Sequence, residues 1–181
     1  FVSLVLLIVL GFLPPASATE FLHTQGENIV DEHGQKIMLR GVGLGNWMLP
    51  EGYMWHFGDE GDRPRKIEKI VSDLIGPANA AKFWQEYRTQ FITEKDIQRI
   101  AQLGFNSVRP SMNARLFLSE GENPVYRDEG FELLDNLIRW CKASGVYVVI
   151  DMHAAPGGQT GQNIDDSIND EPRLFTDSKN Q

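Results

Sequence analysis

Residues 145–163, GVYVVIDMHAAPGGQTGQN, contain the pattern that decides the fold class. The five residues 146–150 are apolar, and Asp151 and His153 follow them closely, ahead of a polar loop rich in glycine. A short apolar run of this kind is typical of a strand that is buried on both faces, as strands of a parallel sheet are. Because side chains alternate along a strand, Asp151 and His153 should share a face, with Met152 opposite. We therefore expect a buried strand that presents two polar side chains at its carboxyl end.

The preceding residues predict an alternation of strands and helices. The T-x-x-D pattern of Thr93 to Asp96 is typical of a helix N-terminus with a capping box, and Gly104 suits the end of that helix. This alternation favours a parallel α/β sheet, either an open doubly wound sheet or a (β/α)8 TIM barrel with about its first three β/α units present. We expect a hairpin from Phe21, a strand at 36–42, a loop at 43–62, helices at 65–75, 78–90 and 93–104, a strand at 105–109 ended by Pro110, a helix at 128–144 and a strand at 146–150.

Residues 41–46, GVGLGN, contain part of a G-x-G-x-x-G turn, which binds the phosphates of a dinucleotide at the start of a helix. Here Asn46 takes the place of the third glycine, and aromatic residues follow instead of a helical pattern. The sequence therefore argues against a nucleotide site, and no other cofactor is indicated.

Residues 1–18 have the pattern of a secretory signal peptide. Residues 1–13 are almost entirely apolar, and this run is shorter than the roughly 20 residues that a bilayer span needs. An A-x-A cleavage signature follows and ends at Ala18. A membrane anchor or a buried helix is the alternative. We expect cleavage after Ala18, a single domain at residues 19–181, and a protein that is extracellular, or periplasmic if bacterial, without membrane association.

The composition is that of a globular domain, with 41% hydrophobic and 23% charged residues. The formal net charge of −8 argues against nucleic acid as a partner, because binding to phosphates needs a cationic surface. The single cysteine, Cys141, excludes an internal disulfide framework, and its place on the apolar face of the helix at 128–144 predicts an unreactive thiol.

Polar groups follow the first two predicted strands as well as the third. Asn46, Trp47 and Glu51 come after the first strand, and Arg109 ends the second. Ligands of parallel α/β proteins bind at the carboxyl ends of the strands, so these residues are candidates for a site. A buried arginine needs a carboxylate partner. Arg109 would form either a structural ion pair or a contact that keeps a catalytic carboxylate ionised by lowering its pKa.

His153 is compatible with three roles. Together with Asp151 it could bind a metal, but a metal site needs three or four ligands, and the other histidines lie in the predicted hairpin and loop. It could also be a structural histidine. We favour a third role, in which His153 forms a hydrogen bond to a polar substrate.

Three aromatic residues of the loop at 43–62 allow two interpretations. Trp47, Tyr53 and Trp55 either fill the loop as packing or present faces on which sugar rings stack. Aromatic faces beside carboxylates and amides suit sugars, because a sugar offers apolar C–H faces and many hydroxyl groups.

Three segments together resemble glycoside hydrolase family 5, in particular its cellulase and exo-β-glucanase members. They are RGVGLGNWMLPE at 40–51, TEKDIQRIAQLGFNSVRPSMN at 93–113 and the opening segment at 145–163. The matches occur in order at predicted strand ends and extend over about residues 26–175. The resemblance implies a (β/α)8 barrel that hydrolyses O-glycosidic bonds with retention of configuration, without a metal or another cofactor.

The resemblance also implies a role for each matching residue. Arg109 corresponds to the arginine that contacts the catalytic nucleophile and keeps it ionised. His153 and Glu51 correspond to residues that bind the sugar next to the scissile bond, while Trp47 and Asn46 would line the pocket. Asn46 departs from the glycine usual at its position.

The family pattern further implies two glutamates, an acid/base and a nucleophile, which lie about 5 Å apart in retaining enzymes. These follow the fourth and seventh strands, and a complete barrel takes roughly 250 residues. We therefore expect residues 19–181 to be a truncated N-terminal part that lacks both glutamates. Glu51, Glu120 and Glu122 lie in predicted loops and are not expected to replace them.

The sequence thus predicts a secreted, monomeric β-glycosidase that acts on β-glucan or a related polysaccharide or oligosaccharide. The present chain alone should be inactive. Two alternatives remain open at this point, namely a non-catalytic carbohydrate-binding barrel and a metal-dependent barrel hydrolase that uses Asp151 and His153.

Overall fold

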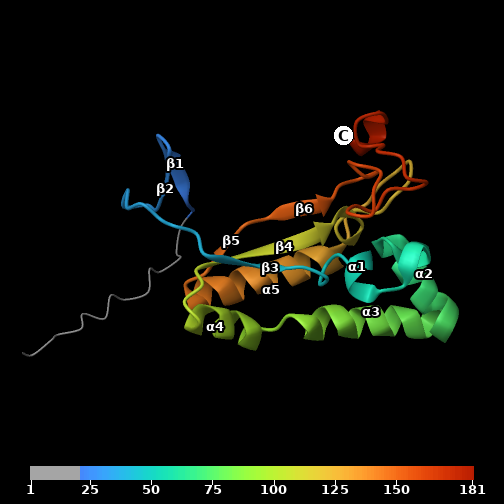
Figure 1. Cartoon of the computed structure of the whole chain (residues 1–181), viewed down its shortest axis with the longest axis horizontal. Helices are drawn as coiled ribbons and strands as arrows, with labels where there is room; N and C mark the ends of the chain where they lie inside the picture. Colours follow the sequence, from blue (N-terminus) through green and yellow to red (C-terminus); the bar gives the residue numbers. More distant parts are fainter. Residues whose placement is uncertain (1–20) are drawn as a thin grey trace, which may run out of the picture.

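A computed structural model describes residues 21–181, and the predicted signal peptide at 1–18 lies outside them. The described chain is an α/β structure around a parallel sheet (Figure 1). Strand β4 is central and pairs with β3 on one side and with β5 and β6 on the other. The expected parallel sheet is confirmed. The strands are β3 (Gly41–Leu44), β4 (Ser107–Asn113), β5 (Tyr147–Val148) and β6 (Asp151–Ala154).

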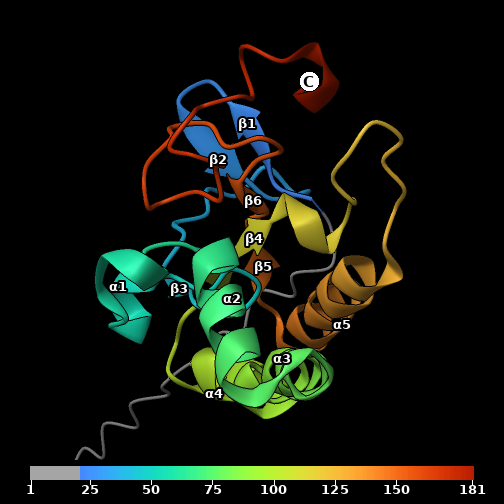
Figure 2. The same ribbon diagram turned by 90° about the vertical axis from the view of Figure 1, so that its right-hand side faces the viewer.

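Two helices cover one face of this sheet, as Figures 1 and 2 show. They are α4 (Glu94–Gln102) and α5 (Asp128–Ser144). Their buried side chains Ile97 and Leu137 pack with Val108 and Met112 of β4 in the main hydrophobic core. Arg109 lies on the other face of β4, since side chains alternate along a strand. Within residues 21–181, no helix is long and apolar enough to cross a bilayer.

The segment between β3 and α4 forms a second, smaller core. It contains the short helix α1 (Gly52–Trp55), the 3-10 turn η1 (Gly58–Gly61), α2 (Pro64–Ile75) and α3 (Pro77–Phe91). Ile67, Val71 and Trp84 are buried there, and Trp55 packs against them. The remaining elements are the hairpin strands β1 (His23–Gln25) and β2 (Asn28–Val30) and the 3-10 turns η2 (Ala114–Leu116) and η3 (Ser178–Asn180).

The first parallel strand begins later than predicted, at Gly41 rather than at residue 36. The amide of Ile37 donates to the carbonyl of Ile29, so this stretch first continues the pairing of the hairpin. The side chain of Asn106 then holds the segment that leads from the hairpin into β3. It accepts from the amide of Arg40 at 2.7 Å and donates to the carbonyl of Met38 at 2.9 Å. These hydrogen bonds join residues that are far apart in the sequence.

Pro110 does not end its strand, contrary to the prediction. The amide of Val149 donates to the carbonyl of Val108. Every second residue of β4 bonds the chain segment that contains β5, so the next residue of β4 whose amide would donate to this segment is Pro110. Proline has no N–H to donate, and the pairing is interrupted at residues 149–150, between β5 and β6. The predicted single strand at 146–150 is therefore two short strands, and Asp151 and His153 lie inside the second.

The predicted helix boundaries around α4 and α5 are confirmed. The carboxylate of Asp96 accepts hydrogen bonds from the amide of Thr93 at 2.8 Å and from its hydroxyl at 2.7 Å. Gly104 and Gly145 follow α4 and α5 with φ of 86° and 68°, the left-handed conformation that favours glycine.

Candidate functional site

Arg109, Asp151 and His153 lie together on the face of the sheet that the helices leave uncovered. Arg109 Nη2 is 2.8 Å from Oδ2 of Asp151, and His153 Nδ1 is 3.0 Å from the same oxygen. The register explains the contact, because β6 pairs with β4 so that Asp151 is opposite Ser111, two residues beyond Arg109. The structure thus brings together one cation, one carboxylate and one imidazole from two adjacent strands.

The carboxylate of Asp151 determines which nitrogen of the imidazole carries the proton. An ionised carboxylate only accepts hydrogen bonds, so the 3.0 Å contact requires a proton on Nδ1 of His153. Arg109 Nη2 also lies 3.4 Å from Nδ1, but two donors cannot share a hydrogen bond. In the neutral imidazole, Nε2 is then the acceptor and is suited to a hydroxyl group of a ligand.

The structure corrects the expectation that Arg109 is buried. Half of its side chain, 51%, is exposed, whereas Val108 and Pro110 on either side are buried. The alternation of β4 is the reason, since Val108 faces the core beneath the sheet and Arg109 faces away from it. Its partner is the carboxylate of Asp151, so other N–H groups of the guanidinium remain for a further acceptor.

Asn46 and Glu51 close the loop after β3 with reciprocal hydrogen bonds. The amide of Asn46 donates to Oε1 of Glu51 at 3.1 Å, and the amide of Glu51 donates to Oδ1 of Asn46 at 3.0 Å. Asn46 has φ of 62°, a left-handed conformation that asparagine adopts more readily than most residues, which accounts for Asn in place of glycine. The Tyr87 hydroxyl donates to the Asn46 carbonyl at 2.6 Å and fixes this turn from α3.

Trp47 does not line a pocket, and the expectation for this residue is corrected. Only 1% of Trp47 is exposed, it packs in the main core, and its indole N–H donates to the carbonyl of Arg88 at 2.6 Å. Trp55 likewise fills the loop, because it contacts Trp84 and Tyr87 and donates to Oδ1 of Asn46. Large aromatic side chains gain most from burial, so packing takes precedence at both positions.

Tyr53 is the member of the aromatic group that remains open to solvent, with 62% of its surface exposed. Desolvation and a hydrogen bond with Glu51 raise the pKa of its phenol. Tyr53 therefore offers an aromatic face and a neutral hydroxyl beside the Asn46–Glu51 turn.

Two buried aspartates, which the sequence analysis did not single out, organise the loop after β6. Asp165 is fully buried and accepts from the amides of Thr160 and Ser167, and these hydrogen bonds lower the pKa of its carboxyl against the opposing effect of burial. Asp166, 3% exposed, accepts from the amide of Arg65 and from the side chain of Asn113, both at 2.9 Å. The sequence feature that could have indicated these residues is the pair of adjacent aspartates shortly after a glycine-rich loop.

A buried arginine joins the same loop to the start of α2. Arg63 is 3% exposed, donates to the Ser167 hydroxyl at 2.8 Å and pairs with the carboxylates of Asp62 and Asp170. The hydrogen bond with Asp62 and the charges of both carboxylates raise the pKa of Arg63 against the effect of burial. Ionic contacts of Arg63 with Asp170 and of Arg65 with Asp166 thus hold the loop after β6 against the start of α2.

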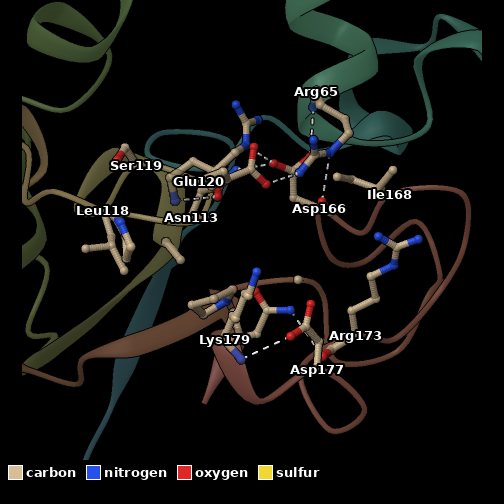
Figure 3. Close-up of a pocket in the computed structure, with 18 of the residues that line it drawn as sticks. Arg65, Asn113, Leu118, Ser119, Glu120, Asp166, Ile168, Arg173, Asp177 and Lys179 are labelled. Atoms are coloured by element: carbon tan, nitrogen blue, oxygen red, sulfur yellow. Dashed lines mark hydrogen bonds and ion pairs between the residues drawn. The ribbon is translucent and has the colours of Figure 1, made fainter.

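A cavity of about 280 Å³ lies between the loop after β4 and the loop after β6. Figure 3 shows Arg65, Glu120 and Asp166 on one side of this cavity and side chains from the end of the chain, including Lys179, on the other. Asn113 of β4 also lines it. The cavity therefore adjoins the carboxyl end of the central strand.

Within residues 21–181, no three His, Cys, Asp or Glu side chains come together in a way that could hold a metal ion. Cys141 is fully buried on α5, and burial raises the pKa of its thiol to about 12. The described part of the chain thus offers a site of hydrogen-bonding and ionic groups at the strand ends.

Comparison with known proteins shows which family the chain matches. Residues 72–179 match the family model described as Cellulase (glycosyl hydrolase family 5). A β-xylosidase of Phanerodontia chrysosporium is 35% identical over 140 residues, which are 77% of this chain and 29% of that protein. A probable glucan 1,3-β-glucosidase A of Aspergillus clavatus is 34% identical over 128 residues, 70% of this chain and 30% of that protein. The chain thus spans under a third of the length of these relatives.

The fold also resembles that of a solved structure. The crystal structure of rutinosidase from Aspergillus niger superimposes with a TM-score of 0.55 and 20% sequence identity, covering 70% of this chain and 36% of that one. At this level of identity the comparison shows a shared fold.

Proposed function

Because the chain belongs to glycosyl hydrolase family 5, we propose that the protein that contains it is a retaining β-glycosidase of β-glucan or a related polysaccharide. The parallel sheet would be part of a (β/α)8 barrel. Since the chain spans 29–30% of the two relatives, we assign the activity to the natural gene product that contains this chain. The observation that carries the proposal is the contact of Arg109, Asp151 and His153 on the open face of the sheet.

His153 is the main substrate-positioning group in this proposal. With Nδ1–H directed to Asp151, the neutral ring presents Nε2 as an acceptor for a sugar hydroxyl. Gln159 fixes the backbone directly after the residue that carries the ring, donating to the carbonyl of His153 and accepting from the amide of Ala155. A ligand that is held in one orientation reaches the reacting carboxylates with less loss of entropy.

Arg109 supplies a fixed positive charge. Its contact with Asp151 orients the guanidinium, and its exposed half is open toward the face where a substrate would lie. A carboxylate placed against the remaining N–H groups would have a lowered pKa and would stay ionised, as a nucleophile in a retaining mechanism must.

Glu51 and Asn46 would bind the same sugar from the loop after β3, with Tyr53 as a stacking face. One oxygen of Glu51 accepts from the amide of Asn46, which holds the carboxylate against this turn. Trp47 takes no part in contacting substrate and supports this loop from the core.

The two catalytic glutamates are proposed to come from the rest of the natural gene product. Glu120 pairs with Arg65 and Glu122 with Lys179, both in loops away from the Arg109 contact, so neither is assigned a catalytic role. The signal-peptide pattern of residues 1–18 supports secretion of the protein.

The experiment is to express the natural gene product and assay a soluble β-1,3-glucan, a β-1,4-glucan and aryl β-glucosides and β-xylosides. We expect hydrolysis of at least one glycan, with the β anomer as the first product by NMR. Initial release of the α anomer would contradict a retaining mechanism. Binding without hydrolysis would instead indicate a carbohydrate-binding barrel, and loss of activity after chelation would indicate a metal-dependent hydrolase.

A further inference from the structure

We propose that Asn46 is a positioning residue whose side-chain oxygen holds the short helix α1 and thereby sets where Glu51 meets the sugar. The inference rests on the proposed glycosidase function and adds to it the residue that controls how the loop after β3 binds substrate. Three observations carry it, namely the partners of the Asn46 oxygen, the shortness of α1 and the close packing of the Glu51 carboxylate.

Both lone pairs of Oδ1 of Asn46 are used within the protein. This oxygen accepts one hydrogen bond from the amide of Glu51 at 3.0 Å and another from the indole N–H of Trp55 at 2.7 Å. Glu51 directly precedes α1 and Trp55 is the last residue of that helix, so one oxygen atom joins both ends of α1 to the turn. A sugar could therefore contact the side chain of Asn46 only through its amide nitrogen.

Helix α1 depends on such contacts because it is too short to hold its own orientation. It has four residues, about one turn, and among the described residues no side chain caps its N-terminus. The ring of Trp55 packs against Trp84 and Tyr87, but apolar packing is non-directional. The hydrogen bond of 2.7 Å to Asn46 adds a fixed direction to this packing. Removing it should let α1 turn on its apolar support.

The carboxylate of Glu51 has little freedom beside this turn. Its Oε1 accepts from the amide of Asn46 at 3.1 Å, and the carboxylate is also hydrogen-bonded to the phenol of Tyr53. A Cβ atom at Gly45 would lie only 2.7 Å from Oε1 of Glu51 and 3.4 Å from Cε of Met54, so both side chains lie directly against the backbone of Gly45. A small movement of α1 would therefore displace the carboxylate and the phenol together.

Asn46 itself is the fixed point of this arrangement. Tyr87 of α3 donates to its carbonyl at 2.6 Å, and the next residue, Trp47, donates to the carbonyl of Arg88 at 2.6 Å. The backbone of Asn46 has φ of 62°, a conformation that glycine adopts without a steric penalty. Asn46→Gly therefore removes the bridge to α1 and preserves the turn.

The test is a double-mutant cycle in the natural gene product, with the glycan or aryl glycoside that it hydrolyses fastest as substrate. The variants are Asn46→Gly, Trp55→Phe and the two combined. Phenylalanine keeps an aromatic ring at position 55 but removes the indole N–H that donates to Asn46. The matched control is Asn169→Gly, because Asn169 is also an asparagine in the left-handed conformation, with φ of 54°, and is exposed in the loop after β6. Thermal unfolding of each variant sets an assay temperature at which all of them are folded.

We expect Asn46→Gly to raise KM by about fivefold or more and to change kcat by less than about twofold, as when uniform binding of the substrate is weakened. Trp55→Phe should act in the same direction. The double variant should lose less kcat/KM than the product of the two single losses, by about threefold or more, because both substitutions break the same hydrogen bond. Asn169→Gly should leave both constants unchanged.

Two results would overturn the positioning role and leave the proposed function intact. Single losses that multiply in the double variant would show that Asn46 acts on the sugar independently of Trp55. An unchanged KM of Asn46→Gly with a lower thermal midpoint would show a purely structural role. If the unchanged protein hydrolyses no glycan or glycoside, the proposed function fails, and this inference fails with it.

Discussion

Nδ1 of His153 lies 3.0 Å from Oδ2 of Asp151, so a carboxylate two residues earlier on the same strand orients the imidazole. The same oxygen lies 2.8 Å from Nη2 of Arg109 on the neighbouring strand. Asp151 is therefore the residue that holds the other two in place, although the sequence resemblance assigns it no contact with substrate.

Asp151→Asn tests this positioning role. The amide loses the charge that pairs with Arg109 and can donate as well as accept, so the imidazole is no longer held in one tautomer. We expect kcat/KM of the natural gene product to fall by about tenfold or more, in the range of other lost orienting contacts. Asp59→Asn, in the exposed turn η1, is the control and should leave kcat/KM unchanged. Full activity of Asp151→Asn would show that the carboxylate is dispensable.

Tyr87→Phe tests the support of the Asn46 turn and has a defined pH dependence. Burial raises the pKa of Tyr87 to about 12 from its usual value of 10.0. Between these two pH values the folded state therefore keeps the phenol proton, whereas the unfolded chain releases it. The contribution of Tyr87 to stability is thus fully present below pH 10 and is lost as pH rises through 12. We expect the difference in free energy of unfolding between wild type and Tyr87→Phe to shrink over this window.

Chemical denaturation at a series of pH values measures that difference. At neutral pH, Tyr87→Phe should be destabilised by about 1 kcal/mol, because the carbonyl of Asn46 loses its donor. A difference that stays constant from pH 9 to 12 would contradict the assignment of the hydrogen bond to a partly buried phenol.

Arg63→Met tests the ionic anchor of the loop after β6. The substitution keeps a long side chain but leaves Asp62 and the Ser167 hydroxyl without their buried partner. We expect the free energy of unfolding to fall by about 2 kcal/mol, the scale of a hydrogen bond to a charged group. Amide hydrogen exchange in residues 155–177 should rise more than in α5.

Arg139→Met, on the exposed side of α5, is the control for the loss of one positive charge and should change stability by less than about 0.5 kcal/mol. If exchange in α5 rises as much as in residues 155–177, Arg63 stabilises the whole domain rather than this loop.

Cys141 should be unreactive in the folded protein. Its thiol is fully buried and its pKa is raised to about 12, so very little thiolate exists at pH 8. We expect iodoacetamide to label Cys141 only after denaturation in guanidinium chloride, as measured by peptide mass spectrometry. Comparable labelling rates with and without denaturant would contradict the burial of this residue.

Local patterns predicted much of the architecture. The parallel sheet, the helix from Thr93 with its end at Gly104, and the helix at 128–144 were predicted because capping, left-handed turns and apolar runs depend on neighbours in the sequence. The common face of Asp151 and His153 followed from the period of a strand, and their hydrogen bond agrees with it.

What the sequence alone determined, therefore, is the class of fold and the strand ends at which polar groups gather. The tertiary structure decided whether each of those side chains faces the core or the open side of the sheet. Trp47 is buried and Arg109 is half exposed, because the burial of each side chain depends on which other segments of the chain pack against it. The structural role of Asp166 could be recognised only from the fold, since its partner Arg65 lies 101 residues earlier in the chain.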